Sequence, residues 1–128
     1  MKAEAVIPVL RMFDYQKAKE FYVDWLGFEI LWEHTFEENF PVYMEIQRAN
    51  IKFHLSEHYG DGTPGTHIFI WCDGIEDFHK ELSAKDYKYN KPGLQETFYE
   101  ALSFTVTDPF GNNIIFNQKL ERNYESDL

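Results

Sequence analysis

The stretch Ile7-Pro8-Val9-Leu10-Arg11-Met12-Phe13-Asp14 sets the pattern from which the fold can be predicted. It is an apolar run that ends in an aspartate, a residue type that caps helices, and a helical pattern through Phe21 and Leu26 follows it. The same order returns at His67-Ile68-Phe69-Ile70-Trp71-Cys72-Asp73, ahead of a helical pattern that reaches Leu82. A strand and helix that occur twice predict two copies of one module, which together build a cleft.

The first copy continues with three further strands. Its opening strand is predicted over Ala5–Met12 and holds Pro8, whose missing N–H indicates a sheet edge or a bulge. Gly27 is expected to end the helix, because glycine accepts the left-handed backbone of a helix C-terminus. The strand patterns that follow are Phe28–His34, Val42–Arg48 and Ile51–Glu57, with a tight turn at Ala49-Asn50.

The second copy repeats this order. Its predicted elements are a strand over Thr66–Cys72, a helix over Ile75–Lys85, and strands over Tyr87–Lys91, Ala101–Thr107 and Ile114–Gln118. Asp86 stands where Gly27 stood, and aspartate also tolerates a left-handed backbone. Asp108-Pro109-Phe110-Gly111-Asn112 predicts a turn that joins the last two strands as a hairpin.

These patterns predict one α+β domain over residues 1–128, in which two βαβββ modules form a curved mixed sheet around a cleft. Module one covers about 4–58 and module two about 66–119. The segment 59–65 between them holds three glycines and a proline, which predicts a linker. Residues 120–128 lose periodicity and predict a tail or short helix.

Composition narrows the class of partner. With 22 acidic and 12 basic residues the net charge is −10, which argues against nucleic acid or an anionic membrane and favours a cationic ligand, although such a charge can also serve solubility alone. Cys72 is the single cysteine, so no disulfide can form within the chain. No apolar run has the length of a signal peptide or a membrane span, and we expect a cytoplasmic protein.

Three groups of residues resemble a known family. They are Val6-Ile7-Pro8-Val9-Leu10 ahead of Asp14, Glu20-Phe21-Tyr22 with Leu26-Gly27-Phe28, and Asp108-Pro109-Phe110-Gly111-Asn112 ahead of a strand. Together they resemble the glyoxalase or vicinal-oxygen-chelate superfamily, and within it the bleomycin-resistance proteins. The resemblance runs from about Val6 to Gln118.

The resemblance implies a metal position on each of four strands, and this chain fills only two of them with possible ligands. Ile7 and Ile115 occupy two positions and cannot bind a metal, whereas His54 and His67 occupy the others. A catalytic zinc normally has three protein ligands, so we expect no metal or other cofactor, and His54 and His67 are hydrogen-bonded histidines in this interpretation. No nucleophile motif is present, so we predict no catalytic residues.

Aromatic residues are abundant, with 12 Phe, 8 Tyr and 3 Trp, or 18% of the chain. Many belong to the predicted core, namely Phe21, Phe28, Phe53, Phe78, Phe104 and Phe116. The remainder suits a planar cation through stacking and charge–face attraction, and Glu33, Glu37 and Glu38 are expected beside it. The predicted ligand-binding residues are Trp32, Phe36, His54, His67, Phe69, Trp71, Phe98 and Tyr99, several of which match cleft positions that the resemblance implies.

The sequence therefore favours a protein that binds and sequesters a bleomycin-type glycopeptide without chemistry, and the resemblance implies a homodimer. Two alternatives remain open at this point. One is a metal-dependent lyase, isomerase or dioxygenase that uses His54 and His67 with further ligands. The other is a sensor or stress protein that binds a different aromatic cation.

Overall fold

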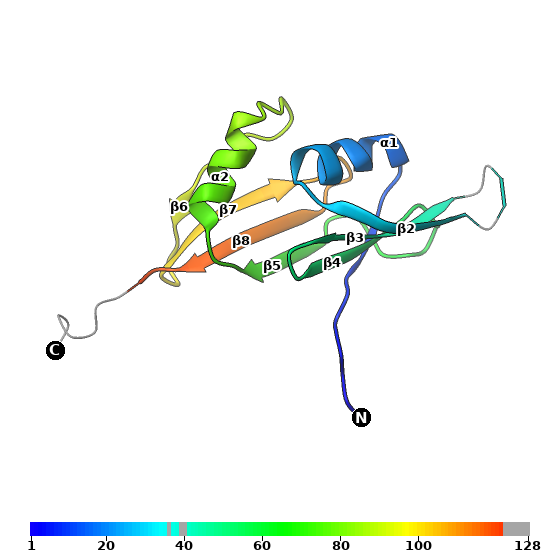
Figure 1. The fold of residues 1–128 in the computed structure, drawn as a ribbon, viewed down its shortest axis with the longest axis horizontal. Coiled ribbons are helices and arrows are strands. Elements are labelled where there is room, and N and C mark those ends of the chain that lie inside the picture. Colours follow the sequence, from blue (N-terminus) through cyan, green and yellow to red (C-terminus); the bar gives the residue numbers. More distant parts are fainter. Residues whose placement is uncertain (36, 39–40, 122–128) are drawn as a thin grey trace. The chain divides into compact units, whose positions relative to one another are not determined.

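The computed structural model describes residues 1–35, 37–38 and 41–121. The chain divides into two compact units, of which the first comprises residues 1–66 and 107–112, and the second comprises 67–106 and the chain from 113 onward. Each unit contains a helix and a four-stranded sheet (Figure 1). Among the described residues, no helix is long and apolar enough to cross a membrane.

The first unit contains β1 (Val9–Arg11), α1 (Tyr15–Ala18), η1 (Lys19–Trp25), β2 (Glu29–Thr35), β3 (Val42–Arg48) and β4 (Ile51–Ser56). Its sheet has the order β1-β4-β3-β2, in which β1 runs parallel to β4 and the other pairs are antiparallel. Pro8 immediately precedes the edge strand β1, and its carbonyl accepts a hydrogen bond from the His54 amide at 2.9 Å. The prediction that Pro8 lies at a sheet edge is confirmed.

The helix of the first unit begins and ends as its sequence predicts. The Asp14 side chain accepts a hydrogen bond from the Lys17 amide at 3.0 Å, and Gly27 has the left-handed φ of 79° that ends the helix. Its second part is the π-helix η1, where the Leu26 amide donates to the Phe21 carbonyl at 2.9 Å. Tyr22 and Phe28 contact Phe53 of β4, so this helix covers one face of the sheet.

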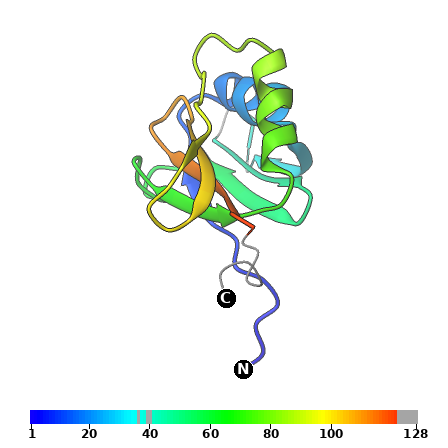
Figure 2. The same ribbon diagram turned by 90° about the vertical axis from the view of Figure 1, so that its left-hand side faces the viewer.

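The second unit contains β5 (His67–Trp71), α2 (Ile75–Ala84), β6 (Gln95–Glu96), β7 (Ala101–Thr107) and β8 (Asn113–Lys119). Its sheet has the order β5-β8-β7-β6, and β5 runs parallel to β8 just as β1 runs parallel to β4. Phe78 of α2 packs on Phe104 and Phe116 at 5.6 and 5.0 Å, so α2 covers one face of this sheet (Figure 2). The prediction of an α+β fold with two repeated modules is confirmed.

One local prediction for the second unit is wrong. Residues 87–91 form no strand: the Asn90 amide closes a turn onto the Tyr87 carbonyl at 3.2 Å, and Pro92 follows. The strand of this region is instead the two-residue β6, which pairs with β7. His79 of α2 is half-buried, since its Nε2 lies 2.7 Å from the Pro92 carbonyl and its ring contacts Phe104.

Most of the predicted core is confirmed. Five of the six phenylalanines are buried, namely Phe21, Phe28, Phe53, Phe104 and Phe116, whereas Phe78 is half-buried. Asp108 is buried in the predicted turn and accepts hydrogen bonds from the amides of Phe110 and Asn112. The Tyr22 hydroxyl also donates to Asp108, at 2.7 Å, and ties the turn to the helix of the first unit. The last residues of the predicted tail, 122–128, lie outside the described residues.

Candidate functional site

In the first unit, the helix covers one face of the sheet, and no helix among the described residues of that unit covers the other. Side chains alternate between the two faces along a strand. Met44 and Ile46 of β3 are therefore buried beneath the helix, whereas Tyr43 and Glu45, which alternate with them, lie on the other face. The register pairs Glu45 with His54 of β4, which places their side chains next to each other on this open face.

A β-bulge adds Trp32 to the same face. In β2, Ile30 pairs with Ile46 but Trp32 pairs with Glu45, so Leu31 is the extra residue. Without the bulge, alternation would turn Leu31 toward Glu45 and Trp32 toward the helix. As a result Trp32 is 42% exposed and stacks on Tyr43, with ring centroids 5.9 Å apart and planes 9° apart.

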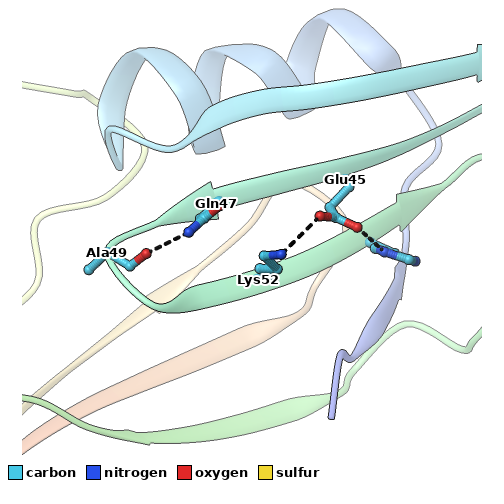
Figure 3. A network of polar contacts seen from close by, with 5 residues as sticks. Glu45, Gln47, Ala49 and Lys52 are labelled. Carbon is cyan, nitrogen blue, oxygen red and sulfur yellow. Dashed lines mark hydrogen bonds and ion pairs between the residues drawn. The ribbon is translucent and has the colours of Figure 1, made fainter. Parts of the chain in front are cut away.

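Tyr43, His54 and Glu45 form a continuous hydrogen-bonded chain beside this tryptophan. The Tyr43 hydroxyl lies 2.7 Å from His54 Nδ1, and His54 Nε2 lies 2.8 Å from Glu45 Oε2. Lys52 Nζ approaches the other oxygen of Glu45 at 3.5 Å (Figure 3). The hydrogen bond from His54 and the charge of Lys52 lower the pKa of Glu45, so this carboxylate is ionised at neutral pH.

An open pocket of about 450 Å³ adjoins this chain and is lined by Trp32, His34, Tyr43, His58 and Asp61. Ser56 Oγ fixes Asp61 by donating to its Oδ2 at 2.8 Å. The loop that holds Asp61 passes close to β1 at Gly62. A Cβ atom at this position would lie 3.1 Å from the Val9 carbonyl oxygen, and the φ of Gly62 is +76°. Burial and the negative charges of Asp61 and Glu45 raise the pKa of Tyr43, which keeps its phenol protonated.

The second unit exposes a different aromatic cluster on the face that α2 leaves open. Phe69 and Trp71 of β5 are 48% and 49% exposed, and their ring centroids lie 5.1 Å apart. Tyr99 contacts both rings, at 5.6 and 6.1 Å, and donates its hydroxyl to Asn117 Oδ1. Lys119 Nζ lies 5.4 Å from the centre of the Trp71 ring.

A second open pocket, of about 420 Å³, borders this cluster. Its lining residues are Trp71, Cys72, Asp73, Gln118, Lys119, Leu120 and Glu121. Burial raises the pKa of the Cys72 thiol, which disfavours the reactive thiolate. The pocket therefore offers an aromatic wall and carboxylates rather than an activated nucleophile.

The structure places the predicted site residues in two groups, one within each unit. Trp32 and His54 contact each other in the first unit, with ring centroids 5.3 Å apart. Phe69, Trp71 and Tyr99 form the cluster of the second unit, and Phe98, which is 96% exposed, contacts Tyr99 at 5.0 Å. His67 is exposed on β5 and alternates onto the same face as Phe69 and Trp71. Phe36 lies outside the described residues.

One predicted acidic residue faces the other way. Glu33 pairs with the buried Met44 and accepts a hydrogen bond from the Tyr15 hydroxyl of α1, so it lies on the helix side of the sheet. Burial and this carboxylate raise the pKa of Tyr15 to about 12. Glu37 and Glu38 are exposed beyond the end of β2.

The predicted binding residues omit Tyr43, Glu45 and Asp61 of the first site, and also His34 and His58, which line its pocket. The alternation of Tyr43, Glu45 and Gln47 against Val42, Met44 and Ile46 was the available signal for the first two. Asp61 carried no such signal, because its loop has no periodicity. Among the described residues, no three His, Cys, Asp or Glu side chains are grouped closely enough to hold a metal ion.

Each unit is an α+β module in which a helix covers one face of the sheet and aromatic residues lie on the other face. The chain belongs to the glyoxalase superfamily, since the family model described as glyoxalase superfamily protein matches residues 1–123. No curated protein sequence matches it significantly.

Solved structures share this fold at low sequence identity. A bleomycin-binding protein in complex with bleomycin is 17% identical, with a TM-score of 0.70 over 91% of this chain and 99% of that one. A bleomycin resistance determinant encoded on the transposon Tn5 is 18% identical, with a TM-score of 0.69 over 91% and 98%. A lactoylglutathione lyase from Agrobacterium tumefaciens is 14% identical, with a TM-score of 0.67 over 92% and 96%. At these sequence identities, the similarity shows a shared fold alone.

Proposed function

We propose that this protein binds a cationic, aromatic small molecule of the bleomycin type and sequesters it without chemistry. The observation that carries the proposal is that Trp32, Phe69 and Trp71, three large aromatic side chains on strands, are left 42–49% exposed on sheet faces that no helix of their own unit covers. Exposed apolar side chains that form a contiguous patch commonly mark a site of ligand or protein binding.

The chemistry of the two faces supports such a ligand. Aromatic faces stack on planar heteroaromatic rings and attract cations, each contact contributing about 0.5–2 kcal/mol. Asp61 borders the aromatic residues of the first unit. Asp73 and Glu121 border those of the second, together with one cation, Lys119. The net charge of −10 raises the local concentration of a cationic ligand. The protein is proposed to act as a single domain, in the cytoplasm and as a homodimer, as the sequence predicts.

Isothermal titration with metal-free bleomycin tests this proposal. We expect a dissociation constant below about 1 μM, equivalent to roughly −8 kcal/mol. Trp71→Ala should weaken binding, whereas Tyr89→Ala, which removes an exposed aromatic residue outside both pockets, should not. The absence of both heat and any change in tryptophan fluorescence at high bleomycin concentration would show that the drug is not the ligand.

A metal-dependent enzyme is the second candidate, and one observation favours it. His54 Nε2 and Glu45 Oε2 lie 2.8 Å apart, so two side chains of metal-binding type already meet on the open face. The positions implied by the family resemblance do not supply a full ligand set, because Ile7 and Ile115 are aliphatic and His54 has both ring nitrogens engaged. Elemental analysis decides: a stoichiometric metal that is lost in His54→Ala would support the enzyme.

A further inference from the structure

The protonation pattern of the Tyr43–His54–Glu45 chain determines what the pocket of the first unit can recognise. A carboxylate can only accept hydrogen bonds, so the 2.8 Å contact with Glu45 requires a proton on His54 Nε2. In the neutral ring Nδ1 is then an acceptor, and the Tyr43 hydroxyl, 2.7 Å away, must donate its single proton to it. The Tyr43 oxygen is left with lone pairs and no proton for a ligand.

The second polar group of the pocket is also an acceptor. Asp61 lines the pocket, and Ser56 Oγ donates to its Oδ2, which leaves the other carboxylate oxygen to accept from a ligand. The stacked rings of Trp32 and Tyr43 form the aromatic wall. No lysine or arginine is among the lining residues in the part of the chain that the structure describes, and the other titratable groups that line the pocket are His34 and His58.

We propose that this pocket binds the N–H-bearing cationic head group of the ligand, a primary ammonium or a guanidinium, through the Tyr43 oxygen and the Asp61 carboxylate. The inference rests on the proposed function, because it assigns one part of a cationic, aromatic ligand to one pocket. Two acceptors beside aromatic faces select a cation that donates hydrogen bonds over a quaternary cation, which offers charge alone. A volume of about 450 Å³ also leaves room for an attached ring.

Three probes of similar size separate these contributions: benzylamine, benzyltrimethylammonium and benzyl alcohol. We expect benzylamine to bind about tenfold more tightly than either of the others, as one charge-assisted hydrogen bond predicts. NMR titration that follows the Trp32 indole signals measures the affinity and locates it. Equal or tighter binding of the quaternary cation would overturn the proposal, because aromatic attraction would then account for the site.

Two variants test the two acceptors. Tyr43→Phe keeps the ring and removes the acceptor, and Asp61→Asn keeps the shape and removes the charge. Each should lower benzylamine affinity by about tenfold. Tyr43→Phe should leave benzyltrimethylammonium affinity within about threefold, whereas Asp61→Asn should weaken it less than it weakens benzylamine, because the quaternary cation loses charge attraction but no hydrogen bond. Their matched controls are Tyr89→Phe and Asp86→Asn, at exposed positions that are not among the residues lining the pocket. Variants that bind benzylamine as tightly as the wild type would contradict the assignment.

The protonation pattern has its own readout, independent of any variant. Nitrogen-15 NMR of the wild-type protein at pH 7 should show His54 with Nε2 protonated and Nδ1 bare. The opposite tautomer or a doubly protonated ring would overturn the acceptor role of Tyr43.

Binding of bleomycin distinguishes this inference from the proposed function. If benzylamine binds more tightly than the other probes and bleomycin does not bind, only the identity of the drug is wrong. If bleomycin binds wild type and Asp61→Asn equally, and benzylamine shows no preference, only the pocket assignment fails.

Discussion

Each unit contains a four-stranded sheet of equivalent strand order, but the residues on the open face differ between the two sheets. In the first unit the aromatic residue Trp32 lies beside a hydrogen-bonded chain in which Tyr43, His54 and Glu45 each have a fixed partner. In the second unit Phe69, Trp71 and Tyr99 contact one another chiefly through their rings. The difference is consistent with the proposal that the first face binds a polar head group through fixed acceptors and that planar groups stack on the second face.

The largest expected effect tests whether the two cores are equally important. Phe53→Ala in the first unit and Phe116→Ala in the second each remove a buried ring that contacts two other rings. We expect each change to lower the free energy of unfolding by about 3–5 kcal/mol, through lost burial and the cavity that remains. Urea unfolding followed by circular dichroism measures it. A loss below about 1 kcal/mol in one variant would show that its unit adds little to the stability of the fold.

A smaller effect compares two tyrosine hydroxyls, one in each unit. Tyr22 donates to the buried carboxylate of Asp108, and Tyr99 donates to the neutral amide oxygen of Asn117. Tyr22→Phe should cost about 1.5–3 kcal/mol of unfolding free energy, because it leaves a buried charged group with one donor fewer, and Tyr99→Phe should cost about 0.5–1.5 kcal/mol. Equal losses from the same urea experiment would show that the charge of Asp108 adds nothing to this bond.

The next comparison concerns ligand binding by the two faces. Trp71→Ala should weaken binding of bleomycin by about 1–2 kcal/mol, or roughly five- to thirtyfold, since it removes a stacking surface. Trp32→Ala should weaken benzylamine as well as bleomycin, because Trp32 lines the pocket proposed for the head group. Calorimetric titration of both variants with bleomycin and with benzylamine measures these losses. A loss of benzylamine binding in Trp71→Ala that matches the loss in Trp32→Ala would remove the distinction between the faces.

How much of this could be predicted from the sequence depends on whether the deciding interaction is local. The bounds of β3 and β7 agree with their predicted ranges, because alternation along a strand is visible in the sequence itself. The left-handed φ of 49° at Asp86 was likewise a local property. The exposure of Trp32 depends on the bulge at Leu31, which appears only when β2 is paired with β3.

The Tyr43–His54–Glu45 chain shows the same limit more sharply. Its members come from two strands, and only the register that pairs Glu45 with His54 makes them neighbours. The sequence predicted a hydrogen-bonded histidine at position 54, with metal binding as an alternative, but it could not identify the hydrogen-bond partners because they lie on a neighbouring strand. The predicted strand at 87–91 was wrong for a related reason, since the turn at Tyr87–Asn90 and the contact of Pro92 with His79 determine that segment.

The smallest expected effect concerns pH and only the first unit. The hydrogen bond from His54, followed by the charge of Lys52, lowers the pKa of Glu45 below its ordinary value of 4.5. A carboxyl whose pKa is lower in the folded state stabilises the fold above its unfolded pKa, and this contribution is lost as pH falls through the folded pKa. Carbon-13 NMR titration should therefore show Glu45 titrating below 4.5, with a larger upward shift in His54→Gln than in Lys52→Met. A wild-type pKa at or above 4.5 would mean that the carboxylate does not hold the histidine, and the fixed geometry that distinguishes the first face from the second would lose its physical basis.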